Sequence, residues 1–196
     1  MRKILNQKFF NRPTLIVAKE LLGKYLVRSQ YFLIRANKKV LRIYKTEALM
    51  ITEVEAYDGF KDKASHARHG KTERNKVMFG EAGRWYVYFT YGMHHMLNIA
   101  TGAKEYPAAV LIRGVKNLPQ LGRFTSKLGE MELNGPAKLT KFLKIDKKLN
   151  NELANRKTGL WIEDRGVKQK NNELRIMNKG GREEKYKIVK TPRIGI

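Results

Sequence analysis

Residues 49–57 read Leu-Met-Ile-Thr-Glu-Val-Glu-Ala-Tyr, and this stretch decides the expected fold. In a β-strand successive side chains point to opposite faces, so regular alternation places Glu55 and Tyr57 on the same side as Leu49 and Ile51. The Asp-Gly pair that follows predicts the end of the strand. A carboxylate and a phenol two residues apart are therefore expected to project together from one face of a sheet.

A second β-prone stretch, Trp85-Tyr-Val-Tyr-Phe-Thr-Tyr-Gly92, predicts the first strand and the tip of a hairpin, with residues 96–100 as the returning strand. Tyr86 and Tyr88 are expected on one face of that strand, and Tyr91 at the tip. Alternating aromatic residues are typical of an ordinary strand core. An exposed ring at a hairpin tip can instead insert into a base stack.

The remaining patterns predict a mixed α+β fold. The expected elements are a helix at 14–22 with an apolar face of Leu15, Ala18, Leu21 and Leu22, strands at 25–34, 40–46 and 108–115, a loop at 58–83 and a helix beginning at 135–138. We expect one domain over residues 1–196, in which 1–12 form a basic arm packed by Phe9 and Phe10.

Charge indicates the class of partner. The chain of 196 residues has 41 Lys and Arg against 18 Asp and Glu, which gives a formal net charge of +23. Such an excess favours a polyanion, of which nucleic acid is the leading candidate. The absence of cysteine excludes disulfides and cysteine nucleophiles. With no signal-like leader or long apolar run, a cytoplasmic protein associated with the nucleoid is expected.

Glu55 is the candidate catalytic acid or base, because a carboxylate among apolar and aromatic residues can activate water. It is equally compatible with a surface acid beside Glu47, Glu53 and Asp58. The four histidines, at 66, 69, 94 and 95, lack the helical His-Glu-x-x-His spacing of a metal site. We therefore expect no metal and no cofactor, with His66 acting as a hydrogen-bond donor in a pocket.

With these residues in hand, the sequence resembles the alkyladenine (3-methyladenine) DNA glycosylases of the single-domain type without a helix-hairpin-helix. The matching pieces follow in family order: Glu53-Val-Glu-Ala-Tyr57, His66, Arg74-Asn75, Met78-Phe79, Tyr86-Val-Tyr88, Tyr91-Gly92-Met93, Asn98-Ile99, Val110-Leu-Ile-Arg113 and Asn134-Gly-Pro-Ala-Lys138. The resemblance implies a curved, open-barrel-like antiparallel sheet with flanking helices and a protruding hairpin.

The resemblance also implies the role of each matched residue. Glu55 would activate water and Arg113 would help to hold it. Tyr57, His66, Tyr88 and Asn98 would line the base pocket, Tyr91 would fill the gap in the duplex, and Lys138 and Arg74 would contact the DNA backbone. The implied enzyme is a monofunctional DNA N-glycosylase that flips alkylated purines out of double-stranded DNA and leaves an abasic site. A monomer is expected, because the protein must engage one damaged site.

The implied substrates are 3-methyladenine and 7-methylguanine, with hypoxanthine and ethenoadenine as further candidates. In one respect the sequence departs from the family, which continues beyond Pro192-Arg-Ile-Gly-Ile196 into a further strand. Two other functions stay open on the residues alone. A basic RNA-binding module would not need Glu55, and a histidine-metal phosphodiesterase would be inhibited by chelators.

Overall fold

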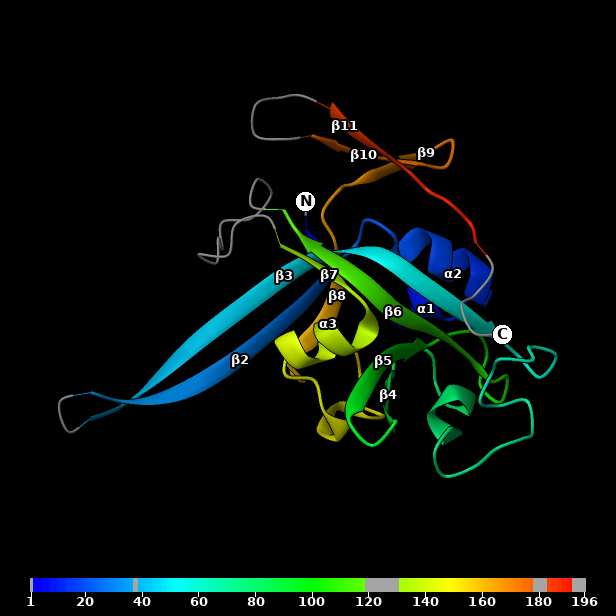
Figure 1. Ribbon diagram of the computed structural model, residues 1–196, viewed down its shortest axis with the longest axis horizontal. Helices are drawn as coiled ribbons and strands as arrows, with labels where there is room; N and C mark the ends of the chain where they lie inside the picture. The colour runs from blue at the N-terminus through cyan, green and yellow to red at the C-terminus, as the bar shows by residue number, and fades with distance from the viewer. Residues whose placement is uncertain (1, 37–38, 119–130, 178–182, 192–196) are drawn as a thin grey trace.

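The protein is described here from a computed structural model, which covers residues 2–36, 39–118, 131–177 and 183–191. It is a mixed α+β structure with a large antiparallel sheet, a smaller three-stranded sheet and few helices (Figure 1). The large sheet is curved and does not close into a barrel, so the α+β class and the open antiparallel sheet expected from the sequence are confirmed.

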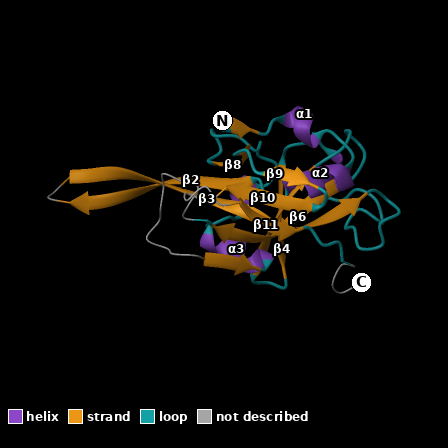
Figure 2. Cartoon of the chain, turned by 90° about the horizontal axis from the view of Figure 1, so that it is seen from above, coloured by secondary structure: helices purple, strands orange, loops and turns teal. Residues whose placement is uncertain are grey.

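The large sheet has the order β1-β8-β2-β3-β6-β5-β4, and β7 pairs with β6. Its strands are β1 (Lys3–Ile4), β2 (Tyr25–Ala36), β3 (Lys39–Asp58), β4 (Trp85–Thr90), β5 (His94–Ala100), β6 (Ala108–Asn117), β7 (Met131–Asn134) and β8 (Leu160–Asp164). The small sheet has the order β11-β10-β9, formed by β9 (Lys168–Lys170), β10 (Glu173–Met177) and β11 (Glu183–Lys187). Figure 2 shows how far the β2–β3 hairpin extends from the rest of the chain.

That hairpin differs from the sequence prediction. Two separate strands, 40–46 and 49–57, were expected after the turn, whereas the structure has one continuous strand, β3, of 20 residues. The β-prone residues on both sides of Glu47 and Ala48 continue to pair with β2 across that point, as Arg28–Glu47 and Val27–Ala48. Glu47 therefore lies inside a continuous strand, with only 13% of its side chain exposed, and does not mark a strand end.

Helix α2 (Thr14–Leu21) packs against β3, and α3 (Pro136–Phe142) packs against β5 and β6. The buried face of α2 consists of Thr14, Val17, Ala18 and Leu21. The prediction that Leu15 belongs to that face is wrong, because its side chain is 65% exposed. Helical spacing allowed either face, and packing against the sheet selected the one that contains Val17.

The N-terminal residues contribute a short strand and a helix to the fold, in addition to the aromatic rings expected from the sequence. Lys3–Ile4 pair with Asp164 and Glu163 of β8, and helix α1 (Gln7–Phe10) follows. Leu5 is buried in the main core together with Phe10, whereas Phe9 is only partly buried. At the other end, residues 192–196, on which the expected departure from the family falls, lie outside the described residues.

The main core lies beneath the sheet and around Trp85, which is fully buried. The indole Nε1 of Trp85 donates a hydrogen bond to the carbonyl oxygen of Leu160 at 3.1 Å, so the ring joins β4 to β8. Val87, two residues further along β4, faces the same core. This leaves Tyr86 and Tyr88 on the opposite face of β4, as strand alternation predicted.

Two irregularities in the β3–β6 pairing shape the region of Glu55. Paired residues run from Ile51–Val115 to Glu53–Gly114 and then to Val54–Ile112. Thr52 is therefore an extra residue on β3, and Arg113 is an extra residue on β6. Such β-bulges change which side chains face the core, and they are common beside active sites.

The bulge reverses which side chains of β3 face the core, and the alternation differs from the prediction for this reason. Leu49 and Ile51 face the main core, and after the extra residue it is Val54 and Ala56 that pack against the same core. Glu55 and Tyr57 consequently face the opposite side from Leu49 and Ile51. The prediction that all four share one face is wrong, although the pairing of Glu55 with Tyr57 is confirmed by their hydrogen bond.

Candidate active site

Glu55 is held from two directions. The hydroxyl of Tyr57 donates a hydrogen bond to Oε2 at 2.7 Å, and Nη1 of Arg113 donates one to Oε1. Only 11% of the Glu55 side chain is exposed. Because each carboxylate oxygen can accept two hydrogen bonds, both oxygens keep capacity for a water molecule. The carboxylate is therefore oriented without being saturated.

Arg113 lies between two carboxylates. Besides Glu55, its Nε lies 3.0 Å from Oε1 of Glu53, but this N–H is not aligned for a hydrogen bond, so the contact is electrostatic. Partial burial opposes the charge on Arg113, yet the hydrogen bond to Glu55 and the charges of Glu55 and Glu53 together raise its pKa. The guanidinium therefore stays charged and fixed beside Glu55.

An aromatic pocket adjoins this carboxylate. It is lined by Tyr57, Ala64, His66, Met78, Tyr86, Tyr88, Asn98 and Ala109, and its volume is about 30 Å³. That space admits about two water molecules, at roughly 10–15 Å³ of accessible volume for each, and is too small for a purine. A base could enter only if the rings moved apart.

The rings of the pocket are in direct contact. Nδ1 of His66 lies 3.0 Å from the hydroxyl of Tyr86, within hydrogen-bond distance. The His66 ring meets Tyr88 edge to face, with centroids 4.6 Å apart, and the Tyr86 and Tyr88 centroids are 5.2 Å apart. These geometries are typical of favourable aromatic pairs. The pocket therefore offers polar and π-electron groups from three rings.

The pocket rings are neutral near pH 7. Burial of part of His66 lowers its pKa below the ordinary 6.5, and the positive charge of Arg74 lowers it further. Burial raises the pKa of both Tyr86 and Tyr88, and the nearby Glu55 charge adds to the rise at Tyr88. A ring pocket without charge of its own favours a cationic ligand over an anionic one.

Asn98 lines the pocket and is 2% exposed. Its Nδ2 donates hydrogen bonds to the carbonyl oxygens of Tyr86 at 3.1 Å and Met96 at 3.4 Å. The amide nitrogen is thus engaged by the β4–β5 backbone. Its oxygen is the part of Asn98 that can contact a ligand.

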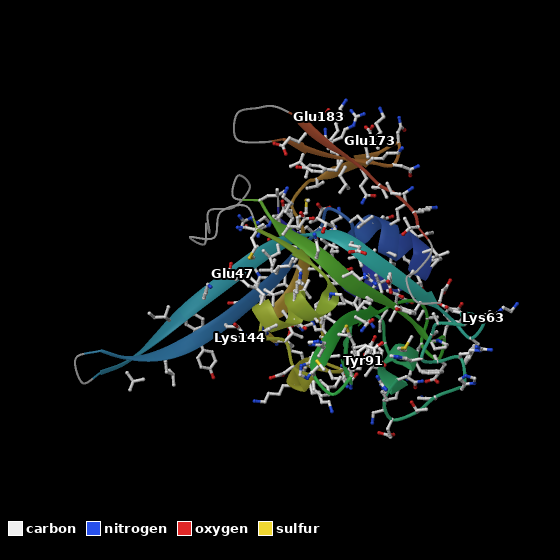
Figure 3. All side chains as sticks on the ribbon, viewed as in Figure 1. Glu47, Lys63, Tyr91, Lys144, Glu173 and Glu183 are labelled. Carbon is white, nitrogen blue, oxygen red and sulfur yellow. The ribbon has the colours of Figure 1, made fainter. Side chains whose placement is uncertain are left out.

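Tyr91 stands at the tip of the β4–β5 hairpin (Figure 3). Its backbone φ is +52° and its side chain is 86% exposed. Met93, in the same turn, is 66% exposed. A left-handed backbone at a residue other than glycine is uncommon and concentrates at functional positions. The turn presents the phenol ring to solvent.

The two predicted backbone-contact residues lie on different elements. Arg74 is exposed on the 58–83 loop, with its guanidinium 5.2 Å from the Tyr88 ring centroid and its Nη2 3.3 Å from the carbonyl oxygen of Phe89. Lys138 is exposed in the first turn of α3. Arg74 therefore adjoins the pocket directly, and Lys138 does not line it.

Sequence reasoning assigned no site role to Tyr86, Met78 and Glu53, or to the two alanines that line the pocket, Ala64 and Ala109. Tyr86 forms the wall next to His66, and its shared strand face with Tyr88 was the signal that could have identified it. Met78, in the 3-10 helix Lys76–Phe79, lines the pocket without a chemical pattern of its own. Glu53 reaches Arg113 only because of the bulge, which the sequence pattern did not reveal.

Within the described ranges, no three His, Asp or Glu side chains come together as they would around a metal ion. His66 and His69 do not form such a group, and neither do His94 and His95. In the same ranges no helix is long and apolar enough to span a membrane.

Comparison with known proteins identifies the family. The sequence model of methylpurine-DNA glycosylase matches residues 8–196. The chain belongs to this glycosylase family. It is therefore a DNA N-glycosylase, a hydrolase of DNA repair that removes alkylated bases.

Individual relatives agree with this assignment. A protein of Wolbachia pipientis wMel is 46% identical over 149 residues, which cover 76% of this chain and 69% of the relative. A protein of Clostridium botulinum strain Alaska E43 is 38% identical over 206 residues, covering 98% and 88%, and one of Ehrlichia chaffeensis is 38% identical over 193 residues, covering 98% and 86%. All three are provisionally named 3-methyladenine DNA glycosylase.

The lowered pKa of His66 gives a prediction for the glycosylase. In a titration followed by NMR, the His66 ring should change protonation below pH 6.5, because burial and Arg74 both disfavour the imidazolium. Substitution Arg74→Gln should move the midpoint upward, toward 6.5, by removing the second cause. A wild-type midpoint at or above 6.5 would contradict this electrostatic description of the pocket.

Proposed function

We propose that the chain excises 3-methyladenine and 7-methylguanine from double-stranded DNA with a water molecule activated by Glu55. The observation that carries this proposal is the half-saturated carboxylate, held by Tyr57 and Arg113 beside an aromatic pocket. A general base must be fixed in orientation and still have a free lone pair for water, and Glu55 meets both conditions.

The first step is extrusion of the damaged nucleotide. A base inside a duplex is out of reach, so the nucleotide rotates outward at a cost of a few kcal/mol, which is smallest for damaged pairs. The exposed Tyr91 ring supports this step, since it can occupy the gap left in the stack. Arg74 and Lys138 would hold the backbone on either side of the extruded nucleotide.

The second step is selection in the pocket. A purine alkylated at N3 or N7 carries positive charge, and aromatic faces attract a cation by about 0.5–2 kcal/mol. Tyr86 and Tyr88 supply such faces, and the Asn98 oxygen supplies a hydrogen-bond acceptor. The lesion is thereby favoured over the neutral normal base before any bond breaks.

The third step is hydrolysis. Water attacks C1′ of the sugar while the bond from C1′ to N9 breaks, and that electron pair leaves with the purine, which becomes neutral. Glu55 takes the proton of the attacking water, and its negative charge stabilises the oxocarbenium-like sugar. The released proton passes from Glu55 to solvent, and the product is an abasic site in an unbroken strand.

The lining of the pocket sets the expected lesion range. None of the described residues that line it is an acid, and His66 is neutral near pH 7 because its pKa is lowered. A cationic purine leaves without acid assistance, whereas hypoxanthine and ethenoadenine need protonation. We propose that the cationic lesions are excised much faster. We also propose a monomer acting on nucleoid DNA, since one lesion engages one site.

The substitution Glu55→Gln tests the proposed base. It keeps the size of the side chain, and its amide can accept a hydrogen bond from Arg113 and donate one to the hydroxyl oxygen of Tyr57, but it cannot accept the proton of water. Base release under single-turnover conditions should fall at least ~100-fold, as expected for loss of a general base. Affinity for lesion-containing duplex should stay within a few-fold of wild type.

Glu47→Gln is the matched control, because Glu47 lies on the same strand but pairs with Lys45 outside the pocket. Base release should be unchanged in this variant. Normal excision by the Glu55→Gln variant would refute the catalytic role.

Tyr91→Ala tests whether the Tyr91 ring acts as a wedge that fills the gap in the duplex. Met93→Ala, in the same turn, is the control. Tyr91→Ala should weaken capture of a lesion in duplex DNA about tenfold and leave release from an unpaired, already extruded base nearly unchanged. The reason is that the ring acts only where a stack must be refilled. Equal losses on the two substrates, or the same loss from Met93→Ala, would count against a wedge.

A further inference from the structure

The extended part of the β2–β3 hairpin, which we call the arm, comprises residues 29–36 of β2 and 39–46 of β3. In the described chain the ladder partners of these residues are each other, because β8 pairs with β2 as far as Arg28 and β6 pairs with β3 from Met50 onward. At the base of the arm, the backbone N–H of Ser29 also donates a hydrogen bond to the carbonyl oxygen of Gly159 at 2.8 Å. The arm leaves the rest of the chain as a two-stranded ribbon (Figures 1 and 2). Its strands reach roughly 25 Å at about 3.3 Å per residue.

The arm exposes large apolar side chains. The exposed fractions are 58% for Tyr31, 63% for Leu33, 60% for Val40, 45% for Ile43 and 66% for Tyr44. Tyr31 and Tyr44 lie opposite each other in the ladder, and their ring centroids are 6.3 Å apart. Isolated two-stranded ribbons are marginally stable in water, so an extension of this kind is more useful as a contact surface than as part of the core.

The charge of the arm is of one sign. Residues 29–36 and 39–46 contain no Asp or Glu, and their charged residues are Arg35, Lys39, Arg42 and Lys45. This excess indicates an anionic partner. An apolar partner alone would not require so many basic residues in so short a stretch.

A basic path joins the Tyr91 hairpin to the arm. Lys147 places its Nζ 5.9 Å from the ring centroid of Phe89 on β4, and the next residue, Lys148, lines a groove of about 650 Å³. Lys144 and Lys157 line the same groove, as do Arg28 and Gln30 at the base of the arm. Asp146 and Glu152 are its acidic members, so its four basic side chains leave it positive.

Figure 3 shows Lys144 between the β2–β3 hairpin and the β4–β5 hairpin that carries Tyr91. The groove thus lies between the base of the arm and Lys147, which contacts Phe89 on β4. A duplex held at Tyr91 meets positive side chains along this path.

We propose that the arm binds in the major groove of the DNA duplex that carries the lesion, several base pairs away from the extruded nucleotide. The major groove of B-form DNA admits a two-stranded β-ribbon, and apolar side chains can contact the methyl group of thymine there. The basic residues of the arm would neutralise phosphates beside that groove. This inference rests on DNA being the substrate and extends the interface beyond the lesion.

The test compares two triple variants with equal loss of charge. The arm variant is Arg35→Gln, Lys39→Gln and Arg42→Gln, and the control is Lys168→Gln, Lys170→Gln and Lys187→Gln on the exposed surface of the small sheet. Binding to a duplex of about 30 base pairs is measured from low to moderate salt. The arm variant should lower the slope of log affinity against log salt by about 2–3, at roughly 0.9 for each lost phosphate contact. The control should lower it by less than about 1.

A second variant removes the arm itself, with residues 31–44 replaced by Asn-Gly, a sequence that favours a two-residue hairpin turn. Nuclease footprints of the wild type should extend several base pairs beyond the lesion on one side, and the shortened variant should lose this extension. Base release from a duplex of about 12 base pairs should be unchanged, which also shows that the variant folds.

If the arm variants keep the salt slope and the footprint of the wild type, the inference is overturned. This result is also the one expected if the partner of the arm is a protein instead of DNA. The proposed function fails separately, if wild-type protein releases no alkylated base. DNA binding, its salt slope and the footprint would still report on the arm in that case.

Discussion

The double bulge between β3 and β6 is the constraint on which the site depends. One extra residue in each strand, Thr52 and Arg113, restores the original register after a few residues. The core faces of the two strands therefore change together, from Ile51 and Val115 on one side of the bulge to Val54 and Ile112 on the other. Because of this change, Glu55 faces away from the core, while its neighbours Val54 and Ala56 pack against the core.

Gly114 makes that geometry possible. A Cβ at this position would lie 3.0 Å from the Cβ of Glu53 and 3.1 Å from Oγ1 of Thr52, closer than atoms normally approach. The absence of a side chain lets the bulged segments of β3 and β6 lie against each other. Arg113, displaced from the regular ladder, can then reach both Glu53 and Glu55.

The sequence predicted the parts of this arrangement that depend on local periodicity. Alternation placed Glu55 with Tyr57, and Tyr86 with Tyr88, and the turn signal placed Tyr91 at an exposed tip. The sequence pattern could not predict that Leu49 faces away from Glu55. The reason is that the bulge arises from contacts between two strands that are about 60 residues apart in the chain. Helical spacing likewise left the buried face of α2 undetermined, and packing excluded Leu15 from it.

Resemblance to the glycosylase family supplied the roles that periodicity cannot give, and the family match supports the reaction class. The geometry adds physical reasons that bear on two features of the site, the charge of Arg113 and the neutrality of the pocket rings. Arg113 is held charged between two carboxylates, and the pocket rings stay neutral because burial lowers the pKa of His66 and raises those of Tyr86 and Tyr88. An uncharged aromatic pocket beside an oriented carboxylate suits a cationic leaving group.

The central claim is hydrolysis by an oriented carboxylate without a metal, and its most direct test is release of free base in the presence of a chelator. Wild-type protein is incubated with EDTA and a duplex carrying one 7-methylguanine. Released base and strand length are then measured in the same sample. The account predicts free 7-methylguanine and an intact strand with an alkali-labile abasic site. Loss of release on chelation, or a covalent protein–DNA adduct trapped by borohydride, would contradict it.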